Sequence, residues 1–436
     1  MQDFINDLKF PTDFLWGTSM SGYQAEGNNI HTDYYHLELE DMKKPADLQR
    51  FTEPSGVSSD HFNRYKEDFR LMKELGFRAH RTTFEWARLF PEKGKFDLHA
   101  ADHYNRVIDS MLENGIRPFI CLNHFTLPYW LYKEGGYENK DFLTYFLEYV
   151  SKLVSHIGDR VHDWVTLNEP NLIPFGAYLV KGMPPFKTSI AAFIRVYRLV
   201  LRMHAESNAL IKSDNTTNRV GTAHAQLLTF PYRKNNPVDI FFSWLVDRLS
   251  NKAVFEFIKS GKFISPLGFG EKYNSGRHEI DFWGINYYRR TFLKGPKPIE
   301  ALPGERTCDL GGASYPQGIY QSIVRAKKEL NVPVYIMENG IGTSDDEWRI
   351  KYIYDHLAEV ARAMNDGYHT EGYFYWSFLD NFEWLHGYKA KFGLVGFDNQ
   401  TFERSVKKSA IFLKEIINHS CCSESEPITK NSLNGV

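Results

Sequence analysis

The chain has 436 residues and a formal net charge of −2, with 42% hydrophobic and 24% charged residues. These values are ordinary for a folded globular protein, and a chain without a long basic block is not expected to bind nucleic acid or an anionic membrane. No apolar run reaches the ~18 residues that a membrane-spanning helix needs. Aromatic residues make up 15%, which favours a large core and a surface that stacks on ring-shaped ligands.

The N-terminal residues and the cysteines predict a cytoplasmic protein. Residues 1–14 contain three aspartates and lack the basic start and apolar stretch of a signal peptide. The four cysteines are Cys121, Cys308, Cys421 and Cys422. Their positions do not form the pattern of a disulfide framework, so the cytoplasm is the expected location.

One unit recurs along the chain: an amphipathic helix that ends near a glycine, then a strand-like apolar run that ends in polar residues. In the first clear copy, the apolar stripe over 62–75 predicts a helix with Asp60 as its N-cap and Gly76 in the left-handed conformation at its end. Similar stripes cover 104–112 and 142–157. The strand-like runs are 14–19, 77–84, 117–122, 164–169, 220–225, 280–287, 334–337 and 372–378.

Eight strands separated by helices predict parallel pairing, because parallel strands need long crossover connections. The expected fold is α/β, a single (β/α)8 TIM barrel, with an open doubly wound sheet as the competing arrangement. The barrel is expected to span 1–419, and a polar, disordered C-terminal tail to span 420–436. Two long segments, 31–56 and 294–315, are expected to form extended βα-loops around the active-site mouth.

Two glutamates lie at the ends of predicted strands, where an acid is costly to bury without a partner or a function. Glu169 ends the fourth strand-like run and Glu338 follows the seventh. Taken alone, Glu169 before Pro170 is explained as a helix cap, and Glu338 as a residue before an Asn-Gly turn. Their shared position in one barrel indicates paired-carboxylate chemistry, of which the glycosidases are the best-known users.

Further polar and aromatic residues fall at or just past the predicted strand ends, where barrel active sites form. They are Arg81, His124, Asn168, Asn286, Tyr288 and Trp376. A lone His124 would more often be structural. The whole set suits a polyhydroxylated substrate, because hydroxyl groups need donors and acceptors and the apolar face of a sugar needs an indole.

Several short motifs occur in a fixed order along the chain. They are FLWG at 14–17, YQAEG at 23–27, the strand around Arg81, HFTLP at 124–128, TLNEP at 166–170, DFWGINYY at 281–288, YIMENG at 335–340 and WSFLDNFEW at 376–384. With these motifs the chain resembles glycoside hydrolase family one, the β-glucosidase and β-galactosidase family, from residue 10 to about residue 412. Each motif alone is weak, whereas all of them in this order are very specific.

The resemblance implies a retaining, exo-acting β-glycosidase that uses no cofactor and no metal. It makes Glu169 the acid/base and Glu338 the nucleophile, places Arg81 and Tyr288 against Glu338, and lets Asn168 bond the sugar 2-hydroxyl. Retaining enzymes hold the two carboxyl groups ~5–5.5 Å apart. Two charges at that distance repel by about 3 kcal/mol at an effective dielectric of 20, or about two pKa units, which keeps one carboxyl protonated.

The resemblance also implies a set of residues that bind the substrate sugar. They are Gln24, His124, Asn286, Trp376 as the stacking platform, Glu383 and Trp384. Glu383 speaks against a phosphorylated sugar, because the 6-phosphoglycosidase branch loses this acid, and Glu169 speaks against the myrosinase branch, which has Gln there. The expected partners are small-molecule β-glycosides and short oligosaccharides: β-glucosides first, with β-galactosides or β-fucosides as side substrates. The protein is expected to be a monomer or a homo-oligomer.

The chain departs from the common family pattern in places that bear on specificity. Phe125 and the segment 312–314 stand where tryptophan is usual, Met337 replaces a frequent threonine, and Leu385-His386 replaces a small residue and an acid. The first two departures are expected to open space around the site. Three alternative functions are a non-catalytic sugar-binding barrel, a β-glycosidase whose main substrate is not a glucoside, and a metal-dependent barrel enzyme, for which no His-Glu-x-x-His motif is present.

Overall fold

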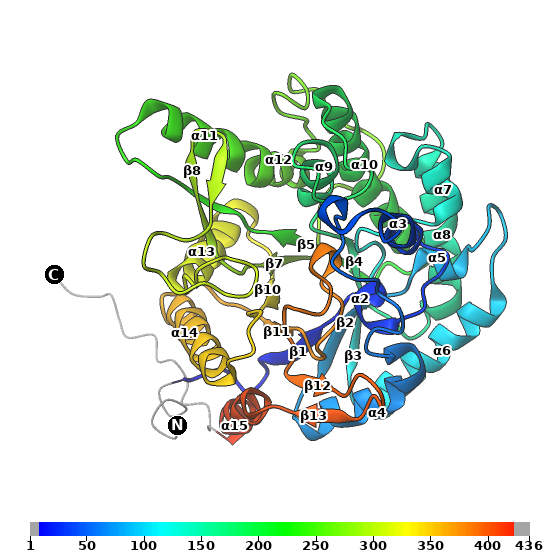
Figure 1. Cartoon of the computed structure of the whole chain (residues 1–436), viewed down its shortest axis with the longest axis vertical. Coiled ribbons are helices and arrows are strands. Elements are labelled where there is room, and N and C mark those ends of the chain that lie inside the picture. Colours follow the sequence, from blue (N-terminus) through cyan, green and yellow to red (C-terminus); the bar gives the residue numbers. More distant parts are fainter. Residues whose placement is uncertain (1–7, 423–436) are drawn as a thin grey trace.

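The computed structural model describes residues 8–422. Within them, eight parallel strands close into a barrel in the order β1-β11-β10-β7-β5-β4-β3-β2 (Figure 1). The barrel strands are β1 (Leu15–Ser19), β2 (Ala79–Thr83), β3 (Arg117–Cys121), β4 (Asp163–Asn168), β5 (Arg219–Ala225), β7 (Phe282–Asn286), β10 (Val334–Asn339) and β11 (Gly372–Trp376). The predicted (β/α)8 barrel is confirmed, and the open doubly wound sheet is not formed.

All eight predicted strands are present, and their ends differ from the prediction by at most two residues. The difference matters at β10, which continues through Asn339, so that Glu338 lies within the strand rather than after it. Glu169 follows the last residue of β4 directly. Both glutamates therefore lie at the carboxyl end of the barrel, where barrel active sites form.

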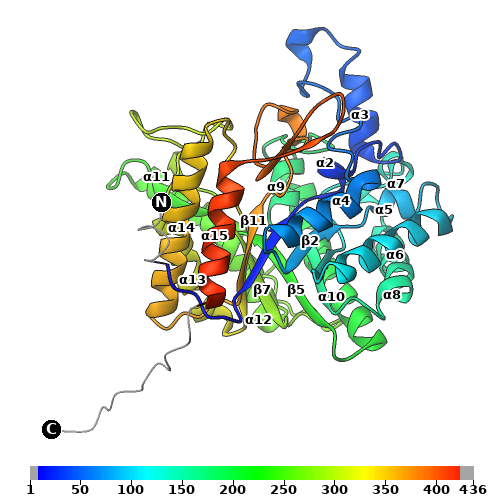
Figure 2. The ribbon, with the colours of Figure 1, turned by 90° about the horizontal axis from the view of Figure 1, so that it is seen from below.

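A ring of helices surrounds the barrel, one after each strand (Figures 1 and 2). These helices are α4 (His61–Glu74), α6 (Leu98–Glu113), α8 (Phe142–Ile157), α10 (Ile190–Asp214), α12 (Ala253–Ser260), α13 (Gln317–Leu330), α14 (Asp346–Asn365) and α15 (Lys408–Cys422). The predicted stripes over 62–75, 104–112 and 142–157 fall on α4, α6 and α8, and most of their apolar residues face the core. Leu112 is the exception, because its side chain is 42% exposed.

The ends of α4 agree only in part with the sequence prediction. Gly76 follows the helix with a φ of 89°, the left-handed conformation that was expected there. Asp60 is the N-cap residue, as predicted, but its side chain accepts no backbone N–H group. The reason is that its carboxylate contacts the side chains of Asn63 and Arg64 instead.

Shorter elements lie in the connections between the barrel strands and helices. They are α2 (Gly22–Glu26), α3 (Asp33–Asp41), η1 (Ala46–Leu48), α5 (Trp86–Leu89), α7 (Tyr129–Lys133), η2 (Gly136–Glu138), α9 (Leu172–Tyr178), β6 (Leu228–Pro231), α11 (Pro237–Asp247), η3 (Arg248–Lys252), β8 (Arg290–Lys294), β9 (Lys297–Ile299), η4 (Trp384–His386), β12 (Val395–Phe397) and β13 (Arg404–Val406). Strands β6, β8 and β9 form a small sheet outside the barrel.

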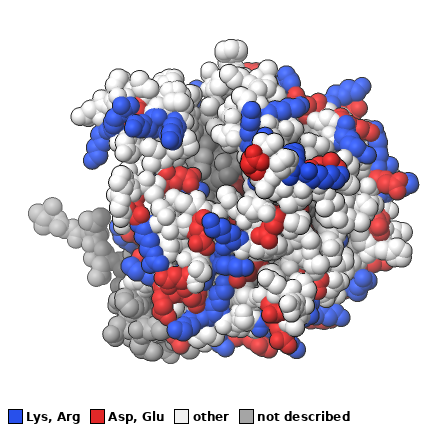
Figure 3. All heavy atoms as spheres, viewed as in Figure 1, with Lys and Arg blue, Asp and Glu red and all other residues white. Residues whose placement is uncertain are grey.

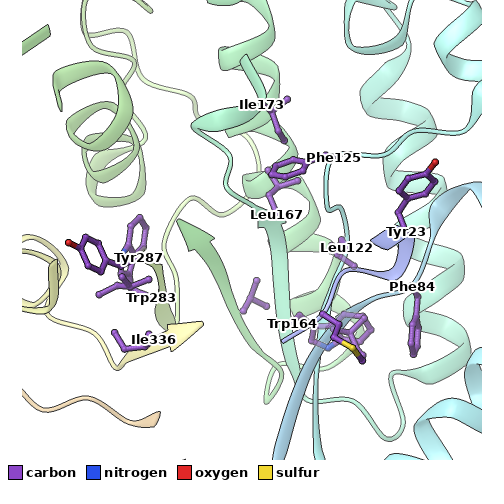
Figure 4. Packing of buried hydrophobic residues seen from close by; sticks show 14 of the residues in the cluster. Tyr23, Phe84, Leu122, Phe125, Trp164, Leu167, Ile173, Trp283, Tyr287 and Ile336 are labelled. Atoms are coloured by element: carbon purple, nitrogen blue, oxygen red, sulfur yellow. The ribbon is translucent and has the colours of Figure 1, made fainter. Parts of the chain in front are cut away.

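Two apolar clusters fill the space inside and outside the barrel wall. The inner cluster contains Phe119, whose ring contacts those of Phe282, Tyr335 and Phe374 at centroid distances of 5.9, 5.6 and 5.0 Å. The larger outer cluster lies between the strands and the helices, and Figure 4 shows part of it. The inner cluster closes the barrel below its carboxyl end and supports the side chains there.

The C-terminal boundary of the barrel domain lies slightly later than predicted. The polar tail was expected to begin at Ser420, but α15 includes this residue, and the buried Ser420 hydroxyl donates to the carbonyl of Ile416. Residues 423–436, the remainder of the predicted tail, lie outside the described residues.

No helix within residues 8–422 is both long and apolar enough to cross a lipid bilayer.

We expect Phe119→Ala to lower the free energy of unfolding by about 3–5 kcal/mol, because it leaves a cavity among three buried rings. Urea denaturation followed by circular dichroism measures this change. Phe269→Ala is the matched control: Phe269 is 99% exposed, so its truncation should change the stability by less than about 0.5 kcal/mol. Equal effects of the two substitutions would contradict the importance of the inner cluster.

Candidate active site

A pocket of about 280 Å³ lies at the carboxyl end of the barrel, on the face of the molecule that Figure 3 shows. Ten of the eleven site residues predicted from the sequence line it. They are Gln24, His124, Asn168, Glu169, Asn286, Tyr288, Glu338, Trp376, Glu383 and Trp384. The eleventh, Arg81, lies behind the wall and contacts two of them. The tertiary structure therefore brings the whole predicted set together.

Glu338 is held by a cation and a phenol. Nη1 of Arg81 forms an ion pair with its Oε1, and the hydroxyl of Tyr288 donates to its Oε2 at 2.6 Å. Burial, followed by the charge of Glu338, raises the pKa of Tyr288 well above its usual value, so the phenol keeps its proton and remains a donor. Both contacts fix the position of the Glu338 carboxyl group.

Glu169 is held differently. Its side chain is buried and accepts from Nδ2 of Asn286 at 3.2 Å, without a direct contact to a cation. Burial, followed by the charge of Glu338, raises the pKa of Glu169 to about 8. At neutral pH Glu169 is therefore mainly protonated, while Glu338 lies in its ion pair.

Asn168 links the two carboxyl groups. Its Oδ1 accepts from Nη2 of Arg81 at 2.6 Å and from Nδ2 of Asn286 at 2.9 Å. A continuous set of hydrogen bonds thus runs from Glu169 through the two asparagines and Arg81 to Glu338. Such a network fixes the mutual position of the two carboxyl groups more tightly than separate contacts would.

His124 is an uncharged hydrogen-bond acceptor in this network. Because Oδ1 of Asn168 already accepts two bonds, its Nδ2 donates to Nε2 of His124 at 3.0 Å. The proton of the imidazole is then on Nδ1, which has no partner within the protein. Burial, and then Arg81, lower the pKa of His124 well below its usual value, so the ring stays uncharged.

A β-bulge aims Glu338 into the barrel. Strand β10 pairs Ile336 with Ile285 of β7 and then Glu338 with Asn286, so that Met337 is an extra residue. Met337 belongs to the inner cluster, and strict alternation would turn the next residue outward. The bulge breaks the alternation and places Glu338 beside the pocket.

A second bulge acts in the same way at the end of β4. The pairing moves from Val165 with Gly221 to Asn168 with Ala223, which again leaves one extra residue. Val165 lies in the inner cluster, whereas Leu167, two residues later, lies in the outer one. Asn168 is turned inward as a result, and Glu169 follows it into the pocket.

Three non-glycine residues that line the pocket have left-handed backbones. They are Phe125, Glu169 and Trp384, with φ values of 76°, 48° and 48°. This conformation is unfavourable for residues with a Cβ atom and persists only where the surrounding structure imposes it. The rings of Phe125 and Trp384 pack against each other with their centroids 5.4 Å apart. The residues with strained backbones are thus among those whose side chains form the pocket wall.

The far end of the pocket combines an amide, a carboxyl group and two indoles. Nε2 of Gln24 donates to Oε2 of Glu383 at 3.0 Å, and Oε1 of Gln24 has no partner within the protein. Burial, then the charge of Glu338, raise the pKa of Glu383 to about 8. Trp376 and Trp384 stack on the ring of His124 with centroids 5.7 and 6.0 Å away.

Gly340 permits the close approach of two strands beside the pocket. A Cβ atom at this position would lie 1.7 Å from the carbonyl oxygen of Trp376, which is a backbone atom that cannot move aside. Steric crowding therefore explains why the YIMENG motif ends in glycine: only a residue without a Cβ atom lets β10 and the end of β11 approach this closely.

Four polar residues of the pocket wall were missed by the sequence interpretation, namely Gln226, Arg289, Thr291 and Glu300. Gln226 directly follows β5, and neither polar atom of its buried amide has a partner within the protein. Its place after a predicted strand was a usable signal. Arg289 and Glu300 form a 2.8 Å ion pair on the wall. They come from different segments, and nothing in the sequence indicated that they meet.

Two expectations about the surroundings of the site need correction. Gly312 does not leave open space, because the side chain of Arg289 crosses it: an added Cβ would lie 2.2 Å from Cδ of Arg289. Of the two predicted mouth loops, 294–315 contributes Glu300 and Leu310 to the pocket wall, whereas 31–56 contributes none of the lining residues. The latter segment instead packs behind the wall, where Tyr34 contacts Trp384.

Between residues 8 and 422, no group of three or more His, Cys, Asp or Glu side chains is arranged to hold a metal ion.

Comparisons with known proteins agree with this geometry. The sequence profile described as Glycosyl hydrolase family 1 matches residues 6–421. The chain is 30% identical to Beta-glucosidase A of Thermotoga maritima, over 95% of this chain and 99% of that protein. It is also 30% identical to a 6-phospho-beta-galactosidase of Staphylococcus epidermidis, over 94% and 98%. The structure of a beta-glycosidase from Pyrococcus horikoshii matches with a TM-score of 0.85 and 35% identity, over 95% and 96%.

We expect Glu338→Gln to lower the pKa of Glu169, because the substitution removes the negative charge that disfavours ionisation of Glu169. A ¹³C NMR titration of protein labelled at glutamate side chains measures this pKa, with the signal assigned by its loss in Glu169→Gln. Glu383→Gln is the control and should give a smaller decrease, because Glu383 contributes less to the shift than Glu338. An unchanged pKa in Glu338→Gln would show that the two carboxyl groups are not coupled.

Proposed function

The chain belongs to glycosyl hydrolase family 1, and from this we propose that it is a retaining, exo-acting β-glycosidase whose main substrates are β-D-glucosides. β-Galactosides and β-fucosides are proposed as further substrates. One observation carries the proposal: of the two buried carboxyl groups at the pocket, one is ion-paired and the other has a pKa of about 8. An ionised nucleophile beside a protonated acid is what a double displacement requires.

In the proposed first step, Glu338 attacks the anomeric carbon and Glu169 protonates the leaving oxygen. Arg81 and Tyr288 hold the nucleophile in place, and Asn168 bonds the sugar 2-hydroxyl, a contact that strengthens in the transition state. The aglycone leaves as an alcohol, and the sugar remains bound to Glu338 as an ester.

In the proposed second step, water releases the sugar. The ester at Glu338 has no charge, so the main electrostatic reason for the high pKa of Glu169 besides burial is removed. Glu169 can then act as the base that takes a proton from the attacking water, which restores its acid form. The two displacements together retain the β configuration.

The shape of the site supports exo action on a single terminal sugar. The volume of about 280 Å³ lies near the lower limit of ligand pockets, which span ~300–1,000 Å³. Gln24, His124, Glu383 and Trp384 are proposed to bind its hydroxyl groups, and Trp376 to stack on its apolar face. The atoms Oε1 of Gln24 and Nδ1 of His124, which lack protein partners, are suited to this role.

The charges of the pocket favour an unphosphorylated sugar, although relatives of similar identity include 6-phospho-beta-galactosidases. Among the described lining residues, Arg289 is the single Lys or Arg, and it is already paired with Glu300. Three further glutamates, Glu169, Glu338 and Glu383, line the same pocket. A phosphate group would find no unpaired cation among these lining residues, and burying its charge without a cationic partner is unfavourable.

The non-catalytic alternative is weaker than the catalytic one. A binding barrel needs hydroxyl partners but has no need for two buried carboxyl groups in different protonation states. Burying both is unfavourable unless a function or a compensating contact retains them. The Arg81 ion pair compensates for Glu338 alone, so Glu169 is explained by catalysis and not by binding.

We expect Glu338→Gly to lower kcat on 2,4-dinitrophenyl β-D-glucoside by at least about 10⁴-fold, because the nucleophile is lost. Added azide should restore turnover and yield the α-glucosyl azide, because the small anion attacks from the vacated side. Product formation is measured by absorbance and the configuration by proton NMR. A fully active Glu338→Gly enzyme would disprove the proposed nucleophile.

Glu300, another glutamate of the pocket wall, provides a matched control. Glu300→Gly removes a carboxyl group from the same wall but should leave kcat within about tenfold of the wild type and show no response to azide. Circular dichroism before the assay separates a loss of chemistry from a loss of folding, since Glu338→Gly leaves the buried Arg81 without its anionic partner.

We expect kcat/KM for 4-nitrophenyl β-D-glucoside to exceed that for its 6-phosphate by at least about 100-fold, or about 2.7 kcal/mol, because the pocket offers the phosphate no unpaired cation. Initial rates at matched ionic strength measure both values. The 4-nitrophenyl β-D-galactoside and fucoside serve as unphosphorylated comparisons. A preference for the 6-phosphate would assign the chain to phosphorylated substrates instead.

A further inference from the structure

Helix α11 carries four large apolar residues on the outside of the molecule. Val238, Ile240, Phe241 and Trp244 are each between 45% and 54% exposed. The residues buried beneath them are polar, namely Asp239 and Ser243. A surface helix normally shows the opposite arrangement, and four large apolar side chains gathered on one exposed helix mark an interaction site.

The inverted orientation of α11 is imposed by its polar contacts. Asp239 pairs with Arg233 at 2.8 Å and accepts from the backbone N–H of Gly295, in the turn between β8 and β9. The carbonyl of Ser243 accepts from Thr229 of β6 at 3.0 Å. These bonds hold the polar side of α11 against the small sheet and leave its apolar side outward.

Basic side chains surround the N-terminal end of this apolar face. Lys294 and Lys297 are opposite one another in the β8–β9 hairpin, whose turn contacts Asp239, and both are exposed. Arg233 and Lys234 precede the helix and are exposed too. Figure 3 shows Lys and Arg gathered over the part of the molecule that Figure 1 assigns to α11 and β8.

The acidic residues of the helix do not cancel this positive charge. Asp239 is buried and paired with Arg233, and Asp247 pairs with Arg325 of α13. The exposed lysines of the hairpin therefore contribute net positive charge beside the apolar face. The net charge of −2 of the whole chain had predicted no anionic membrane partner, but that average conceals a local cationic and apolar surface.

We propose that the outer face of α11, together with the β8–β9 hairpin, docks on an anionic phospholipid surface. Apolar and aromatic side chains that enter the headgroup region, flanked by lysines that pair with acidic lipids, are the two features of an interfacial helix. A symmetric contact with a second copy fits less well, because a twofold axis would bring the same cations face to face.

The docking surface is continuous with the pocket wall. Strand β8 begins beside Thr291, which lines the pocket, and ends at Lys294 on the docking surface. Binding through this surface would place the active-site mouth beside the lipid headgroups. The inference rests on α11 and its surroundings and does not depend on which glycoside the pocket binds.

Co-sedimentation with vesicles tests the proposal on the full chain. We expect binding to vesicles of phosphatidylglycerol and phosphatidylcholine, and at least tenfold weaker partitioning to phosphatidylcholine alone or in 0.5 M NaCl. The double substitution F241S/W244S should lower the partition coefficient at least tenfold. K294E and K297E should each lower it about fivefold or more, as expected for a basic residue near an anionic surface.

Control variants distinguish binding through this surface from nonspecific adsorption to vesicles and from the effects of misfolding. I190S removes an exposed apolar residue of α10 and K408E reverses an exposed charge on α15, and both should bind vesicles like the wild type. All variants should retain wild-type turnover of a soluble aryl glycoside, or equal circular dichroism spectra if the protein proves inactive. The proposal is overturned if wild-type protein ignores anionic vesicles, if the α11 variants bind as well as it does, or if F241S/W244S only converts a dimer to monomers.

Discussion

A guanidinium group buried inside the barrel sets the conditions for everything around it. Arg81 extends from β2 and is 1% exposed, so its charge requires an anionic partner within the protein. Glu338 supplies the charge and Asn168 supplies a second acceptor. The cation is thereby shared between β10 and β4, which do not pair with each other. The same contact that stabilises one carboxylate leaves the other, Glu169, to be buried as an acid.

The barrel supplies the precision that this arrangement needs. Its inner cluster of close-packed rings supports the strand ends from below, and rigid support matters because a carboxyl group displaced by about 1 Å loses much of its effect. One extra residue in β10 and another in β4 then rotate the strand ends. The strand ends that the inner cluster supports are therefore the same ones whose bulges direct Asn168 and Glu338 into the pocket.

The segment between β7 and α13 joins the two surfaces that matter for recognition. Its inner part lines the pocket through Arg289, Glu300 and Leu310, and its outer part carries Lys294 and Lys297 beside α11. The side chain of Arg289 lies across Gly312, so a cation closes this part of the wall. One segment therefore shapes both the pocket and the proposed docking surface.

Periodicity and motif order were enough to predict the eight strands, the barrel and the residues that meet at the pocket, because these depend on local patterns and on a shared strand-end position. The pKa of Glu169, the pairing of Arg289 with Glu300 and the filling of space above Gly312 depend on contacts between distant segments, and no local pattern encodes them. The two bulges belong to the same class, since they exist only relative to a paired strand. Helix α11 is the clearest case: its sequence specifies an apolar side, but only its contacts through Asp239 and Ser243 decide that this side faces outward.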